Sequence, residues 1–281
     1  MLLLSAGCSL ISGYELSDWG QGQPHSLLVW PALWAKSSGY EYKTVAENGL
    51  SNESIARQVI HYCENNPLPD MIIVQWTYLC RYEIRLNHKE QGEHFQQLSS
   101  WSYIVDDHDV IVDRLSTRWL DLSEQEQKKL KEDTKKHLDE ISKSAVGKIA
   151  NVWYELMNCR ETELYHSLRA VSYLKNYLEN KQINYTFSMS EEALLPDETV
   201  VNDVYIKDLI KQVKTAPWIM FGEKNLGFTR WAEDQKFKIG PLYHPLEDAH
   251  YTAYELAKDR LHIASSKTVN TNNKENGNVY S

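Results

Sequence analysis

The stretch Asp70-Met71-Ile72-Ile73-Val74-Gln75-Trp76 decides the fold, and it follows two helix-ending prolines, Pro67 and Pro69. This run is too short for a buried helix, and its apolar residues do not alternate with polar ones. An uninterrupted apolar run of this length is typical of a strand that is covered on both faces. Residues 2–6 form a similar run, which stops at Gly7. The two runs together predict a buried, parallel sheet.

The segments around these runs alternate between helical and extended patterns. Apolar residues recur at helical spacing in 26–37, and residues 40–46 have the pattern of a strand. Ser51 or Asn52 caps a helix that runs to about residue 65. Further along, the pattern predicts a strand at 184–189 and helices at 165–180, 204–213 and 249–263. This β-α-β-α-β order predicts an α/β fold, a three-layer α/β/α sandwich with a mainly parallel sheet of about five strands.

The length of 281 residues is just under two domains of average size, and one enlarged domain explains it. We expect a single α/β domain over 1–263, with residues 84–157 as a helical insertion. Within the insertion, Ser123 and Glu126 form a capping box that starts a long amphipathic helix. Residues 264–281 are polar and nearly without apolar groups, which predicts a disordered tail.

The composition excludes several classes of protein. Thirty Lys and Arg against 39 Asp and Glu give a net charge of −9, which argues against binding to nucleic acid or to an anionic membrane. Seven lysines lie in 128–148, but six acidic residues in 124–140 nearly cancel them, so this helix is predicted to be a solvated face. The acidic and histidine group in 106–109 is predicted to be a solvated loop without a metal.

The expected location is the cytoplasm. The apolar start at residues 1–4 lacks a basic region and ends at Ser5, so it does not match a signal peptide. No stretch approaches the roughly 18 apolar residues of a membrane span. Four cysteines without a Cys-x-x-Cys pair predict reduced thiols, and no cofactor motif is visible. The sequence indicates no oligomeric state.

Polar residues follow the predicted strands, where the ligands of a parallel α/β sheet collect. Ser9 follows the first strand, Gly49 the second and Thr77 the third, and His244 lies in a loop before the last helix. A serine, a glycine-bearing loop and a late histidine supply a nucleophile, oxyanion donors and a base. These are the three parts that acyl transfer needs.

In this pattern the chain resembles the SGNH, or GDSL, hydrolases, a flavodoxin-like α/β group of esterases and lipases. Gly7-Cys8-Ser9-Leu10 stands where the family has Gly-Asp-Ser-Leu, and Gly49 falls on the glycine of its second block. His244-Pro245 matches the family's final His-Pro. The pattern is most similar to uncharacterised phage and marine-microbial members, and the resemblance covers residues 1 to about 262, apart from an insertion at 84–150.

The resemblance implies a serine-dependent ester hydrolase. Ser9 would be the nucleophile and His244 the base, and the N–H groups of Ser9 and Gly49 would hold the oxyanion. The family's oxyanion asparagine is absent, because the corresponding block reads Gln75-Trp76-Thr77-Tyr78, so Thr77 or Arg81 would be the third donor. Pro241 stands where the family has its acid, so Asp248 or Glu247 would replace it, or a backbone carbonyl would orient a Ser–His dyad.

Further residues are predicted to bind the substrate, a small-molecule ester of carbohydrate-like or nucleotide-like character. These candidate binding residues are Asn52, Trp76, Arg81 and Glu83. The surplus of Trp and Tyr over Phe, 26 against 5, suggests that some rings form cleft walls, the candidates being Trp19, Trp30, Trp76 and Tyr78. His250 is predicted to be structural. Two other functions remain open: a catalytically degenerate module that binds a ligand or a protein, and a phosphoester hydrolase with Arg81 as an anion clamp.

Overall fold

The computed structural model describes residues 1–22, 24–88, 92–99, 123, 125, 145–222 and 226–272. Its centre is a parallel sheet in the order β2-β1-β3-β6. The strands are β1 (Leu2–Ala6), β2 (Glu41–Thr44), β3 (Met71–Trp76) and β6 (Tyr185–Met189). Leu4 of β1 lies opposite Ile72 of β3, whose neighbour Ile73 lies opposite Thr186 of β6. The predicted parallel α/β sheet is therefore confirmed.

The sheet has four strands where about five were predicted. The fifth position, next to β6, is taken by a single parallel bridge between Phe187 and Trp218. Around it, the Phe187 N–H donates to the Pro217 carbonyl, and the Ile219 N–H donates to the Phe187 carbonyl. Pro217 has no N–H to donate, which limits the ladder that this segment can form.

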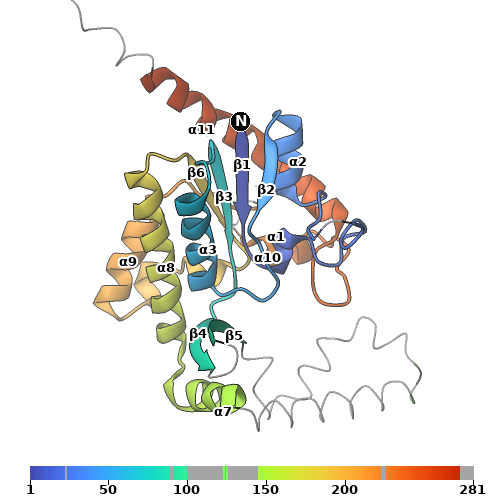
Figure 1. Ribbon diagram of the computed structural model, residues 1–281. Coiled ribbons are helices and arrows are strands. Elements are labelled where there is room, and N and C mark those ends of the chain that lie inside the picture. Colours follow the sequence, from blue (N-terminus) through green and yellow to red (C-terminus); the bar gives the residue numbers. More distant parts are fainter. Residues whose placement is uncertain are drawn as a thin grey trace, which may run out of the picture.

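Helices cover both faces of the sheet, as Figure 1 shows. One face carries α3 (Asn52–Asn65), α8 (Arg160–Asn180) and α9 (Val204–Lys214), and the other carries α2 (Trp30–Ser37), α10 (Phe228–Asp234) and α11 (Glu247–Asn272). Leu4 and Ile72 point to the first layer of helices, whereas Leu3 and Ile73 point to the second. Because successive strand residues face opposite sides, an unbroken apolar run fills both cores at once.

The insertion begins with strands rather than with the predicted helices. β4 (Arg81–His88) and β5 (Gly92–Ser99) pair as an antiparallel hairpin. The long helix predicted from Ser123 lies mostly outside the described residues, but α7 (Ala145–Val152) and a π-helical turn, η3 (Trp153–Met157), occupy its last part. The Tyr82 ring packs edge-on against Trp153, which joins the hairpin to this turn.

The last helix is longer than predicted. α11 continues to Asn272, into the segment 264–281 that was predicted as a polar tail, and residues 273–281 lie outside the described part of the chain. Within that described part, no helix combines the length and the apolar character that a membrane crossing requires.

His250 on α11 joins two helices inside the core, which agrees with its predicted structural role. Its Nδ1 accepts a hydrogen bond from the N–H of Trp30, the first residue of α2, at 3.3 Å. The ring packs against Phe228 at a centroid distance of 4.8 Å. Burial lowers the pKa of His250 from 6.5 to about 3, with the nearby Glu247 raising it and His244 lowering it.

This shift predicts a loss of stability in acid. Below pH 6.5 the unfolded chain binds a proton at His250 that the folded chain takes up only near pH 3. Over this window the free energy of unfolding should therefore fall with decreasing pH, at up to about 1.4 kcal/mol per pH unit from this group. Urea unfolding of the wild type and of His250→Gln from pH 7 to pH 4 measures it. The variant should lose less stability than the wild type, and parallel pH curves would contradict the prediction.

Candidate active site

Ser9 sits at the turn between β1 and the short helix α1 (Ser9–Ser12). Gly7 permits this turn, because a Cβ there would lie 2.7 Å from Ile11 Cγ1 and 3.0 Å from the Gln75 carbonyl oxygen. As the first residue of α1, Ser9 presents an N–H group without an intrahelical acceptor. Its side chain lies at the carboxyl end of β1, beside β3. The order in which the strands are added to the sheet reverses between β1 and β3, and parallel α/β sheets bind their ligands at such a point.

Three side chains form a chain of hydrogen bonds from this serine. Ser9 Oγ lies 2.8 Å from His244 Nε2, and His244 Nδ1 lies 2.7 Å from Glu15 Oε2. The structure thus brings the predicted nucleophile and base into direct contact. It adds a carboxylate on the far nitrogen of the imidazole, which is the arrangement of a serine-histidine-acid triad.

The acid is Glu15, and the predicted candidates lie elsewhere. Asp248 is exposed, and the Glu247 carboxylate accepts the N–H of Ser17. Glu15 is held by the Leu242 N–H, which lies 3.0 Å from both of its carboxylate oxygens. Gly240 leaves room for this carboxylate, because a Cβ there would come within 2.8 Å of Glu15 Oε2.

Two left-handed backbone conformations bring the acid to the histidine. Gly13 ends α1 at φ 75°, and Glu15 itself adopts φ 73°. Tyr243, directly before His244, has φ 65°. A non-glycine residue in this region is strained and is held by its surroundings, and such residues gather at functional sites. In the sequence, Gly13 and Glu15 shortly after Ser9 are the signal that could have indicated this acid. The motifs of the known family do not include an acid at this position.

The loop after β2 lies next to the serine helix. Gly49 adopts φ 82°, and the preceding Asn48 accepts a hydrogen bond of 2.6 Å from the hydroxyl of Ser12 on α1. This bond ties the glycine loop to the helix that carries Ser9. The predicted oxyanion residue Gly49 therefore lies in a loop that is attached to the helix of Ser9.

Thr77 is occupied by other contacts. Its N–H donates to Asn52 Oδ1 at 2.8 Å, and its hydroxyl oxygen accepts from Arg81 Nη1 at 2.9 Å. Thr77 was one of the two residues predicted as a third oxyanion donor, and its backbone N–H is thus already used. Burial raises the pKa of the adjacent Cys8 thiol, but the Arg81 charge and a hydrogen bond with Thr77 outweigh burial and leave that pKa lowered.

The four predicted substrate-binding residues have structural contacts instead. Asn52 is buried, and its amide donates to the Thr77 carbonyl and the Ser167 hydroxyl. Trp76 is fully buried against Phe187. Both residues stabilise the core behind the site rather than face a ligand.

Arg81 and Glu83 each contact other parts of the protein. Glu83 accepts hydrogen bonds from Ser54 and Arg57. Arg81 is only 8% exposed, and its Nη1 also lies 3.5 Å from the Leu50 carbonyl. Its guanidinium is therefore directed into the protein and not into an open anion site.

The predicted cleft walls divide into two groups. Trp30 is fully buried, with its indole N–H on Gln75 Oε1, and Tyr78 bonds through its hydroxyl to Thr229. Trp19 is 36% exposed and lies against Tyr14, whose ring packs edge-on against His244. Among the four predicted rings, Trp19 is thus connected to the histidine through one intervening ring.

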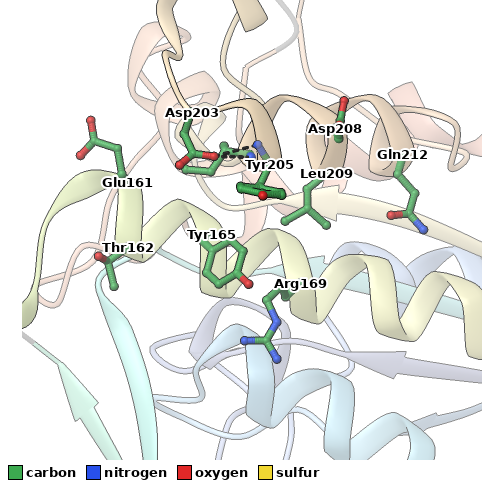
Figure 2. A pocket seen from close by; sticks show the side chains of 10 residues that line it. Glu161, Thr162, Tyr165, Arg169, Asp203, Tyr205, Asp208, Leu209 and Gln212 are labelled. Carbon is green, nitrogen blue, oxygen red and sulfur yellow. Dashed lines mark hydrogen bonds between the residues drawn. The ribbon is translucent and has the colours of Figure 1, made fainter.

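A separate cavity of about 690 Å³ lies between α8 and α9, as Figure 2 shows. Tyr165 and Arg169 come from α8, and Tyr205 and Leu209 from α9. No residue of the Ser9, Glu15 and His244 triad lines it. The hydrogen-bonded triad therefore lies outside this cavity. Across the described residues no group of three or more His, Cys, Asp and Glu could hold a metal ion, and residues 106–109 lie outside them.

No family model matches the chain, and no curated protein matches it either. Solved structures that resemble it include two proteins of the G-D-S-L family and a lipase. The protein from Desulfitobacterium hafniense has a TM-score of 0.40 and 9% identity, and the one from Veillonella parvula has 0.40 and 10%; each match covers 92% of this chain and 97% of the other. The extracellular lipase of Streptomyces rimosus has a TM-score of 0.36 and 12% identity over 93% of this chain and 98% of its own. Similarities this weak carry no argument about activity, which has to come from the site itself.

Proposed function

We propose that the chain is a serine hydrolase that cleaves carboxylic esters with Ser9, His244 and Glu15 as its triad. The observation that carries this proposal is the continuous hydrogen-bond path from Ser9 Oγ through both imidazole nitrogens to the Glu15 carboxylate. The similarity of the Ser9 and His244 segments to the blocks of SGNH hydrolases supports it. In this chain the block that holds the family's acid has Pro241 instead, and Glu15 takes the role of the acid.

The proposed reaction has two halves. Ser9 Oγ attacks the ester carbonyl carbon while its proton passes to His244 Nε2, and the Glu15 carboxylate stabilises the imidazolium that forms. The N–H groups of Ser9 and Gly49 hold the oxyanion. The carbon–oxygen bond to the alcohol then breaks, and His244 returns its proton to the leaving oxygen. In the second half water attacks the acyl-serine by the same route, which releases the acid and restores Ser9.

The substrate we favour is a small acyl ester, such as an acetyl group on a carbohydrate-like or nucleotide-like alcohol. A phosphoester is less well supported, because Arg81 is buried and its Nη1 contacts Thr77 and Leu50. Comparing rates on acetate esters with those on phosphomonoesters separates these two alternatives.

A fluorophosphonate probe tests whether the serine is activated. The native chain should form a covalent adduct whose peptide maps to Ser9, and His244→Ala should suppress labelling because the attacking hydroxyl then lacks its base. A catalytically degenerate binding module would not label. Labelling that maps to another serine, or that persists in His244→Ala, would contradict the proposed triad.

A further inference from the structure

The loop after β2 is fastened to the turn that carries the proposed nucleophile. The Glu47 N–H donates to the Gly7 carbonyl at 3.3 Å. The Ser12 hydroxyl donates to Asn48 Oδ1 at 2.6 Å. Gly7 lies two residues before Ser9 in the chain, and Ser12 lies three residues after it. The start of this loop is thus bonded to the chain on both sides of Ser9.

The far end of the same loop is fastened to the carboxyl end of β3 by Asn52, the first residue of α3. Asn52 Oδ1 accepts the Thr77 N–H at 2.8 Å, and the Asn52 amide donates to the Thr77 carbonyl at 3.4 Å. The same amide donates to the Ser167 hydroxyl on α8 at 3.0 Å. Asn52 is only 1% exposed, so these bonds are made inside the protein, where breaking one leaves a polar group without water. An asparagine side chain therefore holds each end of segment 48–52.

Gly49 lies between the two asparagines and has no side chain through which packing could hold it. It adopts the left-handed φ of 82°. Within the part of the chain that the structure describes, no atom outside its chain neighbours lies within 4 Å of the position that a Cβ would take there. Glycine also has more backbone freedom than any other residue. The direction of the Gly49 N–H therefore depends on the anchors at positions 48 and 52.

We infer that Asn48 and Asn52 are the positioning residues of the oxyanion site, which together fix the direction of the Gly49 N–H. This inference rests on the proposed hydrolase function, in which the Ser9 and Gly49 N–H groups hold the oxyanion. Each asparagine acts through Gly49 and not by contact with the substrate. An oxyanion donor acts at about 2.7–3.1 Å, and a displacement of about 1 Å in an active site can cost about 100-fold in rate. A donor on an unpacked glycine thus needs anchors on both sides.

Asn52→Ala tests the buried anchor. With phenyl acetate as the substrate, kcat and kcat/KM should fall together by about 10-fold to 100-fold, because the donor stabilises the transition state and not the bound ester. The rate constant of fluorophosphonate labelling should fall by a similar factor, since the phosphonyl oxygen uses the same N–H groups. The matched control is Ser167→Ala, which removes the partner of Asn52 on α8 and leaves both bonds with Thr77. This control should lower the melting temperature while kcat stays within about twofold of the wild type.

Asn48→Ala tests the other anchor without disturbing the core, because Asn48 is exposed. It should lower kcat for phenyl acetate by about fivefold to 20-fold at an unchanged melting temperature. In the double variant the loss should stay within the roughly 10²-fold to 10³-fold that deletion of one oxyanion donor costs, because both anchors act through the same N–H group.

The outcomes separate this inference from the proposed function. Wild-type kcat in Asn48→Ala or in a folded Asn52→Ala would overturn the positioning role and leave the hydrolase function intact. Equal kcat losses in Asn52→Ala and Ser167→Ala would do the same, since they would show a general effect of destabilisation. A wild type that neither hydrolyses phenyl acetate nor labels with the fluorophosphonate would instead overturn the hydrolase function and this inference with it.

Discussion

Replacement of Ser9 by alanine is expected to lower kcat for ester hydrolysis by about 10⁴-fold or more. In the proposed mechanism Ser9 Oγ is the atom that receives the acyl group, and it loses its proton along its 2.8 Å hydrogen bond to His244 Nε2. What remains in the variant is binding and the oxyanion donors, which do not supply a nucleophile. Steady-state hydrolysis of an acetate ester measures the effect.

The fold should survive this change. Ser9 loses one oxygen atom at the first position of α1, and its backbone contacts, such as the Gly13 N–H on its carbonyl, remain. Circular dichroism and the melting temperature should therefore stay close to those of the wild type. The exposed Ser37 at the end of α2 provides the control, since Ser37→Ala should retain full activity. A Ser9→Ala variant that keeps more than about 1% of kcat would contradict the proposed nucleophile.

Glu15→Gln is expected to lower kcat by about 10³-fold to 10⁴-fold. The amide keeps the size of the side chain, and its oxygen still accepts the Leu242 N–H. It no longer supplies the negative charge that stabilises the His244 imidazolium during attack. It also stabilises the wrong tautomer of the imidazole whenever its NH₂ group faces Nδ1.

The control for this prediction is Asp248→Asn, which removes the acid that the sequence suggested. That side chain is exposed, so the variant should keep activity within about twofold of the wild type. Glu15→Asp retains the charge on a shorter side chain and should fall between the wild type and Glu15→Gln. Full activity in Glu15→Gln, or a large loss in Asp248→Asn, would show that another group orients His244.

The sheet could be predicted because its central strand β3 is buried on both faces. Met71 to Val74 face two helical layers at once, so the sequence has no polar residue there and the run is unmistakable. The fifth strand position holds only an isolated bridge at Trp218, although residues 216–221 form a continuous apolar run. Pro217 lies in this run and has no N–H to donate, so the apolar pattern alone does not give the observed pairing. The β4–β5 hairpin also escaped prediction, since neither strand joins the main sheet and the segment lacks a long apolar run.

The site was partly predictable for a similar reason. Ser9 and His244 each lie in a short sequence motif, and Gly7, two residues before the serine, marks a tight turn. The acid could not be found by spacing, because Glu15 reaches His244 only through the left-handed backbone at Gly13 and Glu15. Asn52 and Trp76 were predicted to bind the substrate and are buried in the structure, because a polar or aromatic residue near a strand end looks alike in the sequence whether it faces a ligand or the core. Burial and partners distinguish the two, and neither is visible in a single sequence.

The positions of the triad residues along the chain determine the order in which the site is assembled. Ser9 and Glu15 are six residues apart in the chain, whereas Glu15 and His244 are separated by 229 positions. Bringing the nucleophile and the acid together therefore costs little loop-closure entropy, and within the triad the contacts distant in sequence are those to His244. During synthesis the nucleophile and acid leave the ribosome first, and the base leaves last, shortly before α11. If the proposed triad is the catalytic site, activity requires that the C-terminal part of the chain has docked onto the first β-α unit.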